Sequence, residues 1–221
     1  MKNFLFLLTA ILFNTTISSQ SITTGINGYG RIDTFRLPHN YDHPEIDGTA
    51  YSNENYQLGE INAGEVSEVL FRFNIRKNEV EIKYKENIYL LDKKNGYSIS
   101  FNNFQYQVFK NSKGKQEFYL TSINKKKTKL LIKERRTVNT RIFQSSGYSN
   151  NDKNSYSKTK ETYYISFDNK TSIKIPKKGK QFYKLFGKKD TKIKEFISKN
   201  QLNKNNKNDL LKIINYYNTL L

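Results

Sequence analysis

The chain has 221 residues, a formal net charge of +18 and no cysteine. The missing cysteine excludes disulfide frameworks, thiolate metal sites, cysteine nucleophiles and a lipid-modified cysteine. The charge is unevenly distributed: residues 21–90 carry 7 basic and 11 acidic side chains, whereas residues 91–221 carry 30 basic and 9 acidic ones. The resulting net charges of −4 and +21 indicate an anionic partner for the second part of the chain.

The lysine excess also has a purely compositional interpretation. The chain contains 31 lysines, 7 arginines and 27 asparagines. Sites that bind phosphate or carboxylate bidentately favour arginine, and A+T-rich coding sequence by itself enriches Lys, Asn, Ile, Tyr and Phe. Two interpretations stay open: compositional drift with a gain in solubility, or a surface for an anionic partner.

Residues 1–20, MKNFLFLLTAILFNTTISSQ, predict a signal peptide. One lysine precedes an apolar run from Phe4 to Phe13, and small polar residues follow the run. The run is about half of the ~20 residues that a membrane span needs. We expect cleavage near Ser19 or Gln20, a soluble protein in the periplasm or outside the cell, and no transmembrane segment after cleavage. A buried N-terminal helix is the alternative.

Residues 21–47 predict an irregular lead-in, because they hold two of the three prolines and several Gly and Asn residues. A short edge strand is expected from Arg31 to Phe35. The segment also holds weak candidates for a metal site, namely His39, Asp42 and His43. The flanking prolines oppose the helix on which such a histidine pair binds zinc, so solvated side chains are the competing interpretation. No cofactor is predicted.

Residues 48–176 predict an antiparallel β domain. Between Val66 and Leu91 apolar and polar residues alternate, which is typical of a half-buried sheet. A break at residues 76–78 makes this run a hairpin, with Glu79 and Glu81 on its solvent face. Further strands are expected at 57–62, 97–100, 104–110, 116–123, 128–138, 161–167 and 171–175. Turn signals separate them, and residues 144–160 predict an exposed loop.

Residues 177–221 predict three short amphipathic helices. Apolar residues recur at i, i+3 and i+4, first at Phe182 and Phe186 and last from Leu210 to Leu220. Gly187 is placed to end the first helix, Asp190 or Thr191 to cap the second, and Asn206 or Asn208 to cap the third. The apolar stripes favour packing on the sheet, and a basic helix on a membrane surface is the alternative.

The fold class expected is therefore mainly β: an antiparallel meander of about eight to ten strands forming a curved sheet or sandwich, with three C-terminal α-helices. The order of these elements resembles a family of exported proteins of Bacteroidota that have no established activity. The resemblance is carried by GTAYSNENYQLGEIN, LFRFNIRKNEVEIKYKENIYLLD, the paired tyrosines of ETYYISF and the C-terminal helical run. It implies export and a β-rich body with C-terminal helices, and it transfers no site residue.

The sequence contains no motif for nucleophilic catalysis, phosphate cradling or a zinc protease. The first hypothesis is therefore a non-catalytic envelope protein that binds an anionic glycan, a lipid head group or an acidic protein. Export argues against nucleic acid as a partner. The predicted surface consists of Lys125, Lys126, Lys127, Lys177, Lys178, Lys180, Lys188 and Lys189.

Two alternatives belong to other classes. One is a metal-dependent or carboxylate hydrolase, because folding can bring together carboxylates that are far apart in the sequence. The other is a carrier that holds an apolar ligand inside its curled sheet. The sequence does not indicate an oligomeric state.

Overall fold

The computed structural model describes residues 35–36, 46–63, 66–140 and 154–221. The predicted signal peptide, the metal candidates His39, Asp42 and His43, and residues 31–34 of the predicted edge strand lie outside these residues. The predicted fold class is confirmed: the chain is mainly β and mostly antiparallel, with three short helices near its C-terminus.

In the described residues the β part consists of an eleven-stranded sheet and a three-stranded sheet, more strands than the eight to ten predicted. The order in the large sheet is β1-β6-β5-β4-β3-β7-β8-β9-β10-β13-β14, and the small sheet has the order β11-β12-β2. The strands are β1 (Phe35–Arg36), β2 (Ile46–Asp47), β3 (Gln57–Asn62), β4 (Val66–Asn74), β5 (Glu79–Tyr84), β6 (Asn87–Leu91), β7 (Ser98–Phe101), β8 (Phe104–Lys110), β9 (Gln116–Ser122), β10 (Lys129–Arg135), β11 (Val138–Asn139), β12 (Asn154–Tyr156), β13 (Lys160–Ser166) and β14 (Ile173–Lys174).

The run from Val66 to Leu91 forms three strands, β4, β5 and β6, where a single hairpin was predicted. The second turn contains Lys85, whose φ of 53° makes a tight reversal. The alternation of apolar and polar residues did not predict this turn, because lysine is not a typical turn residue. Inward residues such as Phe71, Phe73 and Val80 are buried, as the alternation predicted.

The prediction that Glu81 faces solvent is wrong, because Glu81 is only 8% exposed. It lies opposite Arg72 in the ladder between β4 and β5, and the Arg72 Nε atom is 2.8 Å from a carboxylate oxygen of Glu81. The residues before β3 fold over this pair, where the Tyr51 hydroxyl donates to Glu81 over 2.9 Å. A neighbouring loop has therefore buried the outer face of the hairpin at Glu81, while Lys83 and Lys85 on the same face stay exposed.

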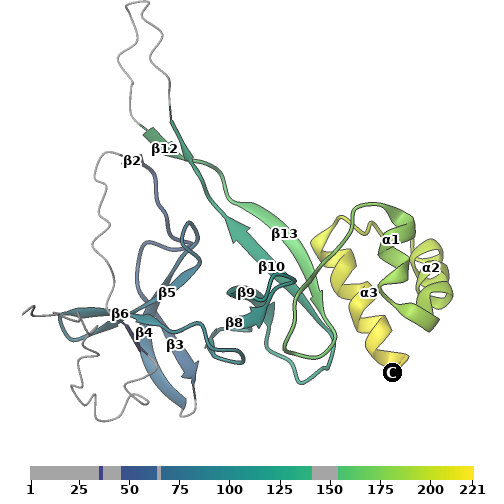
Figure 1. The fold of residues 1–221 in the computed structure, drawn as a ribbon, viewed down its shortest axis with the longest axis horizontal. Helices are drawn as coiled ribbons and strands as arrows, with labels where there is room; N and C mark the ends of the chain where they lie inside the picture. The colour runs from purple at the N-terminus through teal and green to yellow at the C-terminus, as the bar shows by residue number, and fades with distance from the viewer. Residues whose placement is uncertain (1–34, 37–45, 64–65, 141–153) are drawn as a thin grey trace, which may run out of the picture.

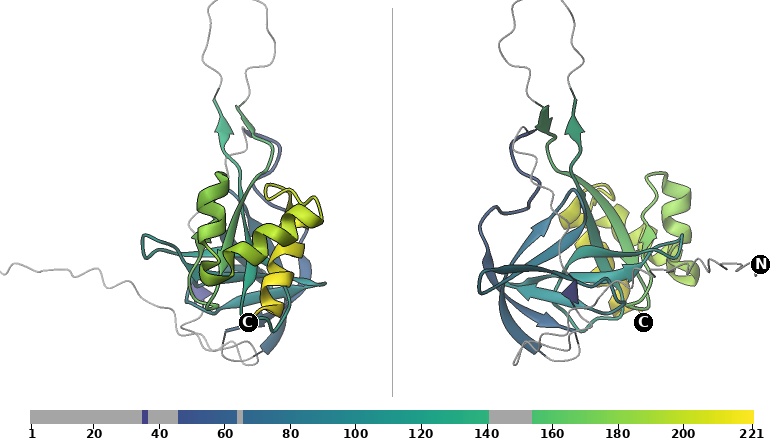
Figure 2. Two further views of the ribbon diagram at one scale, coloured as in Figure 1. Left: turned by 90° about the vertical axis from the view of Figure 1, so that its right-hand side faces the viewer. Right: turned by 60° about the vertical axis from the view of Figure 1, so that its left-hand side comes forward.

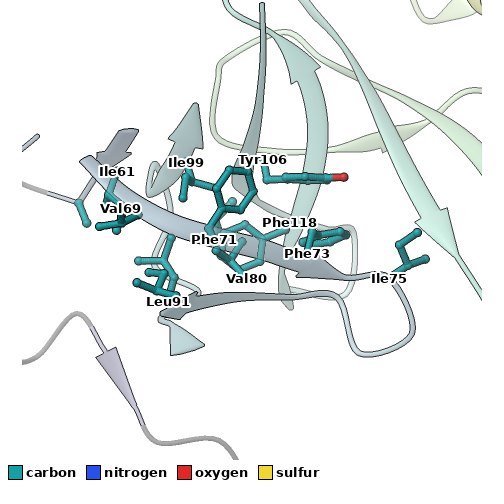
Figure 3. Close-up of a cluster of buried hydrophobic side chains, with 13 residues drawn as sticks. Ile61, Val69, Phe71, Phe73, Ile75, Val80, Leu91, Ile99, Tyr106 and Phe118 are labelled. Carbon is teal, nitrogen blue, oxygen red and sulfur yellow. The ribbon is translucent and has the colours of Figure 1, made fainter. Parts of the chain in front are cut away.

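Aromatic contacts show how strongly the large sheet curls. Phe73 on β4 stacks on Tyr106 of β8, with their ring centroids 3.9 Å apart. Three strand intervals separate β4 from β8, and in a flat sheet they would span about 14 Å. The sheet must therefore wrap around these rings (Figure 3). The views in Figure 2 show the strands curving around this interior.

The side chain of one turn residue, Asn78, links the turn between β4 and β5 to β9 and so closes the curled sheet. Asn78, between β4 and β5, has a φ of 58° and accepts from the Phe118 amide while donating to the Phe118 carbonyl, both over 2.8 Å. Strand β9 pairs with β10 only at Leu120, so the two strands diverge beside Phe118. The Asn78 side chain satisfies the backbone groups that β10 leaves there.

Strand β10 ends at Arg135, before the predicted end at Val138, because the chain then leaves for the small sheet. The Arg136 guanidinium donates to the carbonyls of Thr49 and Tyr51 over 2.7 and 3.0 Å. Residues 154–156, predicted as loop, form β12 between β11 and β2. A strand of three residues between polar segments has too little alternation to be recognised.

The C-terminal part forms α1 (Gly179–Lys184), the 3₁₀ turn η2 (Gly187–Lys189), α2 (Asp190–Lys199) and α3 (Lys207–Thr219). Asn206 caps α3 as predicted, accepting from the amides of Asn208 and Asp209. Asp190 is the first residue of α2, and no side chain caps that helix. The helices lie together beside β10 and β13 (Figure 1).

The helices share a second core with the sheet. Their buried residues, including Phe182, Ile193, Leu210 and Ile213, pack with Leu130 of β10 and other strand residues. This core lies on the same face of the sheet as the one lined by Phe73 and Tyr106, because Leu120 is paired with both Tyr106 and Ile132 and packs against both clusters. No helix in the described ranges is long and apolar enough to cross a membrane.

Candidate binding site

The eight lysines of the predicted surface lie in three places. Residues 125–127 belong to the loop between β9 and β10, and residues 188–189 belong to η2. Lys177, Lys178 and Lys180 lie at the beginning of α1. Seven of the eight are exposed, and Lys189 is half-buried.

A cavity of about 440 Å³ brings the first two groups together. Lys127, Lys188 and Lys189 are among its lining residues, whereas the other five predicted lysines are not. The remaining lining residues come from the loop before β10, the residue after β13, the segment between α1 and η2, and α3 with the residues that follow it: Thr128, Phe167, Leu185, Phe186, Gly187, Tyr217 and Leu221. The cavity is within the size range of pockets for small ligands.

Three aromatic rings form the apolar wall. The centroids of Phe186 and Tyr217 are 5.1 Å apart, and Phe167 meets both rings edge to face at 6.3 and 5.6 Å. Phe186 is buried, and Phe167 and Tyr217 are half-buried. Leu221 is 67% exposed and adds apolar surface at the opening.

Local backbone geometry places the lysines next to this wall. Gly187 has a φ of 53°, a left-handed conformation that allows the chain to reverse after α1. The reversal leaves Phe186 in the core while Lys188 and Lys189 follow immediately on the surface. The prediction that Gly187 caps the first helix is wrong, because α1 ends at Lys184 with Leu185 as its C-cap and Gly187 is the first residue of η2.

Side chains of α3 hold the loop before β10, which forms another part of the cavity lining. The Asn218 side chain accepts from the Thr128 amide over 3.1 Å and donates to the Thr128 carbonyl over 2.9 Å. Nearby, the Lys126 ammonium donates to the Asn215 side chain over 3.0 Å. The Thr128 hydroxyl is buried and has no hydrogen-bond partner. These contacts fix the lysine-bearing loop against the last helix.

The three cavity lysines have no ion-pair partner in the part of the chain that the structure describes. The ion pairs formed there by Arg72, Lys133, Lys207 and Lys212 do not involve them. The nearest carboxylate along the chain is Asp190, which accepts from the Thr191 amide over 2.6 Å. The cavity therefore combines three lysines with an apolar and aromatic wall.

Three other polar clusters, none of them predicted, are closed by partners from the protein. In the first, the Arg72 guanidinium pairs with Glu81 and lies 3.8 Å from the centre of the Tyr51 ring and 4.7 Å from that of Tyr56. The Tyr51 hydroxyl accepts from Arg72 and donates to Glu81. These contacts between Arg72, Glu81 and Tyr51 fasten the loop before β3, whereas the buried Tyr56 hydroxyl has no hydrogen-bond partner among the described residues.

The second cluster surrounds Glu117 on β9. Lys133, Asn111 and Tyr119 all contact one of its carboxylate oxygens, at 2.7, 3.0 and 3.2 Å. Burial by itself would raise the pKa of Glu117, but the bonds from Lys133 and Asn111 hold the pKa below its ordinary value. Three side chains from the protein thus hold one oxygen of the ionised carboxylate in place.

The third cluster contains the carboxylate pair that the hydrolase hypothesis requires. Glu134 on β10 lies opposite Glu161 on β13. Burial raises the pKa of Glu134, and the charge of Glu161 adds to the rise. Tyr106 donates to Glu134 over 2.9 Å, while Tyr163 and Lys207 contact Glu161 at 3.0 and 3.7 Å. Each carboxylate is thus held by the protein itself.

The described part of the chain contains no group of three potential metal ligands. Among the described residues, the cavity is the feature that best combines positive charge with a concave apolar surface. The aromatic wall was not predicted, because Phe167 and Tyr217 occupy positions that the apolar periods assign to a core. Comparison of the chain with family models, curated proteins and solved structures found no match.

Proposed function

We propose that the protein is an exported, non-catalytic protein of the cell envelope that binds an anionic group at the cavity beside η2. The observation that carries the proposal is the convergence of Lys127, Lys188 and Lys189, from two distant parts of the sequence, on one cavity where none of them has an ion-pair partner among the described residues. Uncompensated like charges repel one another, and an anion relieves that repulsion. The signal-like N-terminus supports the export part of the proposal.

The test of anion binding compares two triple variants of the purified protein. Lys127→Ala/Lys188→Ala/Lys189→Ala removes the cavity lysines, and Lys177→Ala/Lys178→Ala/Lys180→Ala removes the same charge from the start of α1. Dodecyl sulfate at submicellar concentration serves as the anion in titration calorimetry. We expect the first variant to weaken binding about ten-fold, since exposed ion pairs contribute roughly 0.2–1 kcal/mol each, and the second to change it little.

Salt provides an independent check of the same site. Raising ionic strength from about 0.01 to 0.15 M shortens the screening length from about 30 to 8 Å, so binding to the wild-type protein should weaken and binding to the cavity variant should respond less. Equal losses in both triple variants would assign binding to net charge and refute the cavity as the site. Export is tested by sequencing the N-terminus of the protein recovered from envelope fractions, where an intact Met1 would contradict it.

A further inference from the structure

The walls of the cavity indicate what else the ligand carries besides its charge. Five of the lining residues are apolar or aromatic: Phe167, Leu185, Phe186, Tyr217 and Leu221. Apart from the lysines, side-chain polar groups in the lining are limited to the hydroxyls of Thr128 and Tyr217, and the Thr128 hydroxyl is buried. Sites that recognise a specific polar ligand have several convergent hydrogen-bonding groups, so this lining is poorly suited to a glycan.

We infer that the ligand is an anionic amphiphile, in which a carboxylate, sulfate or phosphate meets the lysines and an acyl chain lies in the cavity along the wall formed by the aromatic rings. The inference rests on the proposed anion binding and specifies its ligand class. Charge complementarity places the head group at Lys127, Lys188 and Lys189, and Leu221 extends the apolar wall to the opening. The same chemistry occurs in a free fatty anion and in a membrane lipid.

The energetics assign most of the affinity to the chain. An ion pair with an exposed lysine contributes little in water, whereas each buried methylene contributes about 0.8 kcal/mol, which corresponds to about a four-fold change in affinity. A head group alone should therefore bind weakly. Affinity should rise with chain length until the cavity of about 440 Å³ is full and then level off.

The experiment titrates the protein with sodium alkanoates of six to fourteen carbons below their micellar concentrations. We expect up to about a four-fold gain in affinity per methylene, a plateau at the longer chains, and about ten-fold weaker binding of the alcohol with the same chain. Leu221→Ser removes apolar surface at an exposed position, so it should lower the affinity for dodecanoate several-fold without affecting folding. The triple variant at Lys177, Lys178 and Lys180 is the control for charge.

The outcomes separate the two proposals. Binding that depends on the cavity lysines but not on chain length would refute the inference that an acyl chain binds in the cavity, and it would still support anion binding at the lysines. Absence of lysine-dependent binding for any alkanoate or sulfate would refute both.

An experiment with lipid vesicles distinguishes a membrane lipid from a free amphiphilic anion as the ligand. Phosphatidylglycerol vesicles that bind the protein in competition with dodecanoate would support insertion of a lipid chain from a membrane, whereas dodecanoate binding alone supports a free anion. Vesicle binding that dodecanoate does not displace, without any binding of dodecanoate itself, would mean that the lysines meet a membrane surface and would overturn the inference.

Discussion

Replacing Asn78 by glycine tests whether one side chain closes the curled sheet. The substitution removes the two hydrogen bonds, each 2.8 Å long, between the Asn78 side chain and the backbone of Phe118. Phe118 is only 1% exposed, so water cannot easily replace the lost partners. With about 1 kcal/mol for each bond and part of the desolvation penalty added, we expect the free energy of unfolding to fall by about 2–3 kcal/mol.

The backbone contribution can be measured separately, because Asn102 provides a matched control. Asn102 has a φ of 51°, close to the 58° of Asn78, and its exposed side chain has no hydrogen-bond partner among the described residues. Asn102→Gly relieves the strain of the left-handed backbone, which stabilises the folded state, and raises the conformational entropy of the unfolded chain, which destabilises it. Each effect is about 1 kcal/mol, so the two oppose each other. The difference between the two variants isolates the contacts with Phe118.

The assay is urea unfolding followed by circular dichroism, with the slope on denaturant checked for constancy. A difference below about 0.5 kcal/mol between Asn78→Gly and Asn102→Gly, within the range of neutral surface substitutions, would refute the reasoning. It would mean that the aromatic contacts of the interior hold the curl without help from the turn.

Three further predictions concern stability. Thr128→Val removes a buried hydroxyl that has no partner, so urea unfolding should show a gain of about 1 kcal/mol, and a loss of that size would contradict it. Glu134→Gln keeps an acceptor for Tyr106. Because the folded pKa of Glu134 is raised, the wild-type protein loses stability as pH rises above about 4.3, the ordinary pKa of glutamate. The variant should thus be the more stable at pH 7 and lose its advantage below pH 4, and a pH-independent difference in melting temperature would contradict this sign. Asn206→Ala removes the cap of α3 and should cost about 1 kcal/mol in urea unfolding, while Asn205→Ala, at an exposed neighbour, should cost little.

Residue patterns over short distances were enough to predict the fold class and most of the strands. The inward positions of β4 and β5 follow from alternation, and the helical stripe from Leu210 to Ile214 follows from the helical period. Turns built from Asn or Gly were recognised as such. The turn at Lys85 was not, because its residue type does not indicate the positive φ it adopts.

The candidate site was predictable only in its charge. Lys127, Lys188 and Lys189 were in the predicted surface, and nothing in their local sequence distinguishes them from Lys177 or Lys178. The two groups of lysines differ because only the cavity lysines lie next to the aromatic wall. That wall includes Phe167 and Tyr217, whose spacing in the sequence looks like that of core residues. Whether such a ring is covered or borders a cavity depends on how α3 meets the loop before β10, which is a tertiary contact made through Asn218.

The sequence by itself determined which residues prefer strands and helices and where the positive charge accumulates, since both depend on neighbouring residues. Only the tertiary structure decided that Glu81 is buried, that Asn78 closes the sheet and that three lysines share one apolar cavity. Each of these depends on segments far apart in the chain, and their approach is set by the curl of the sheet and the docking of the last helix. A short-range pattern contains no information about such encounters.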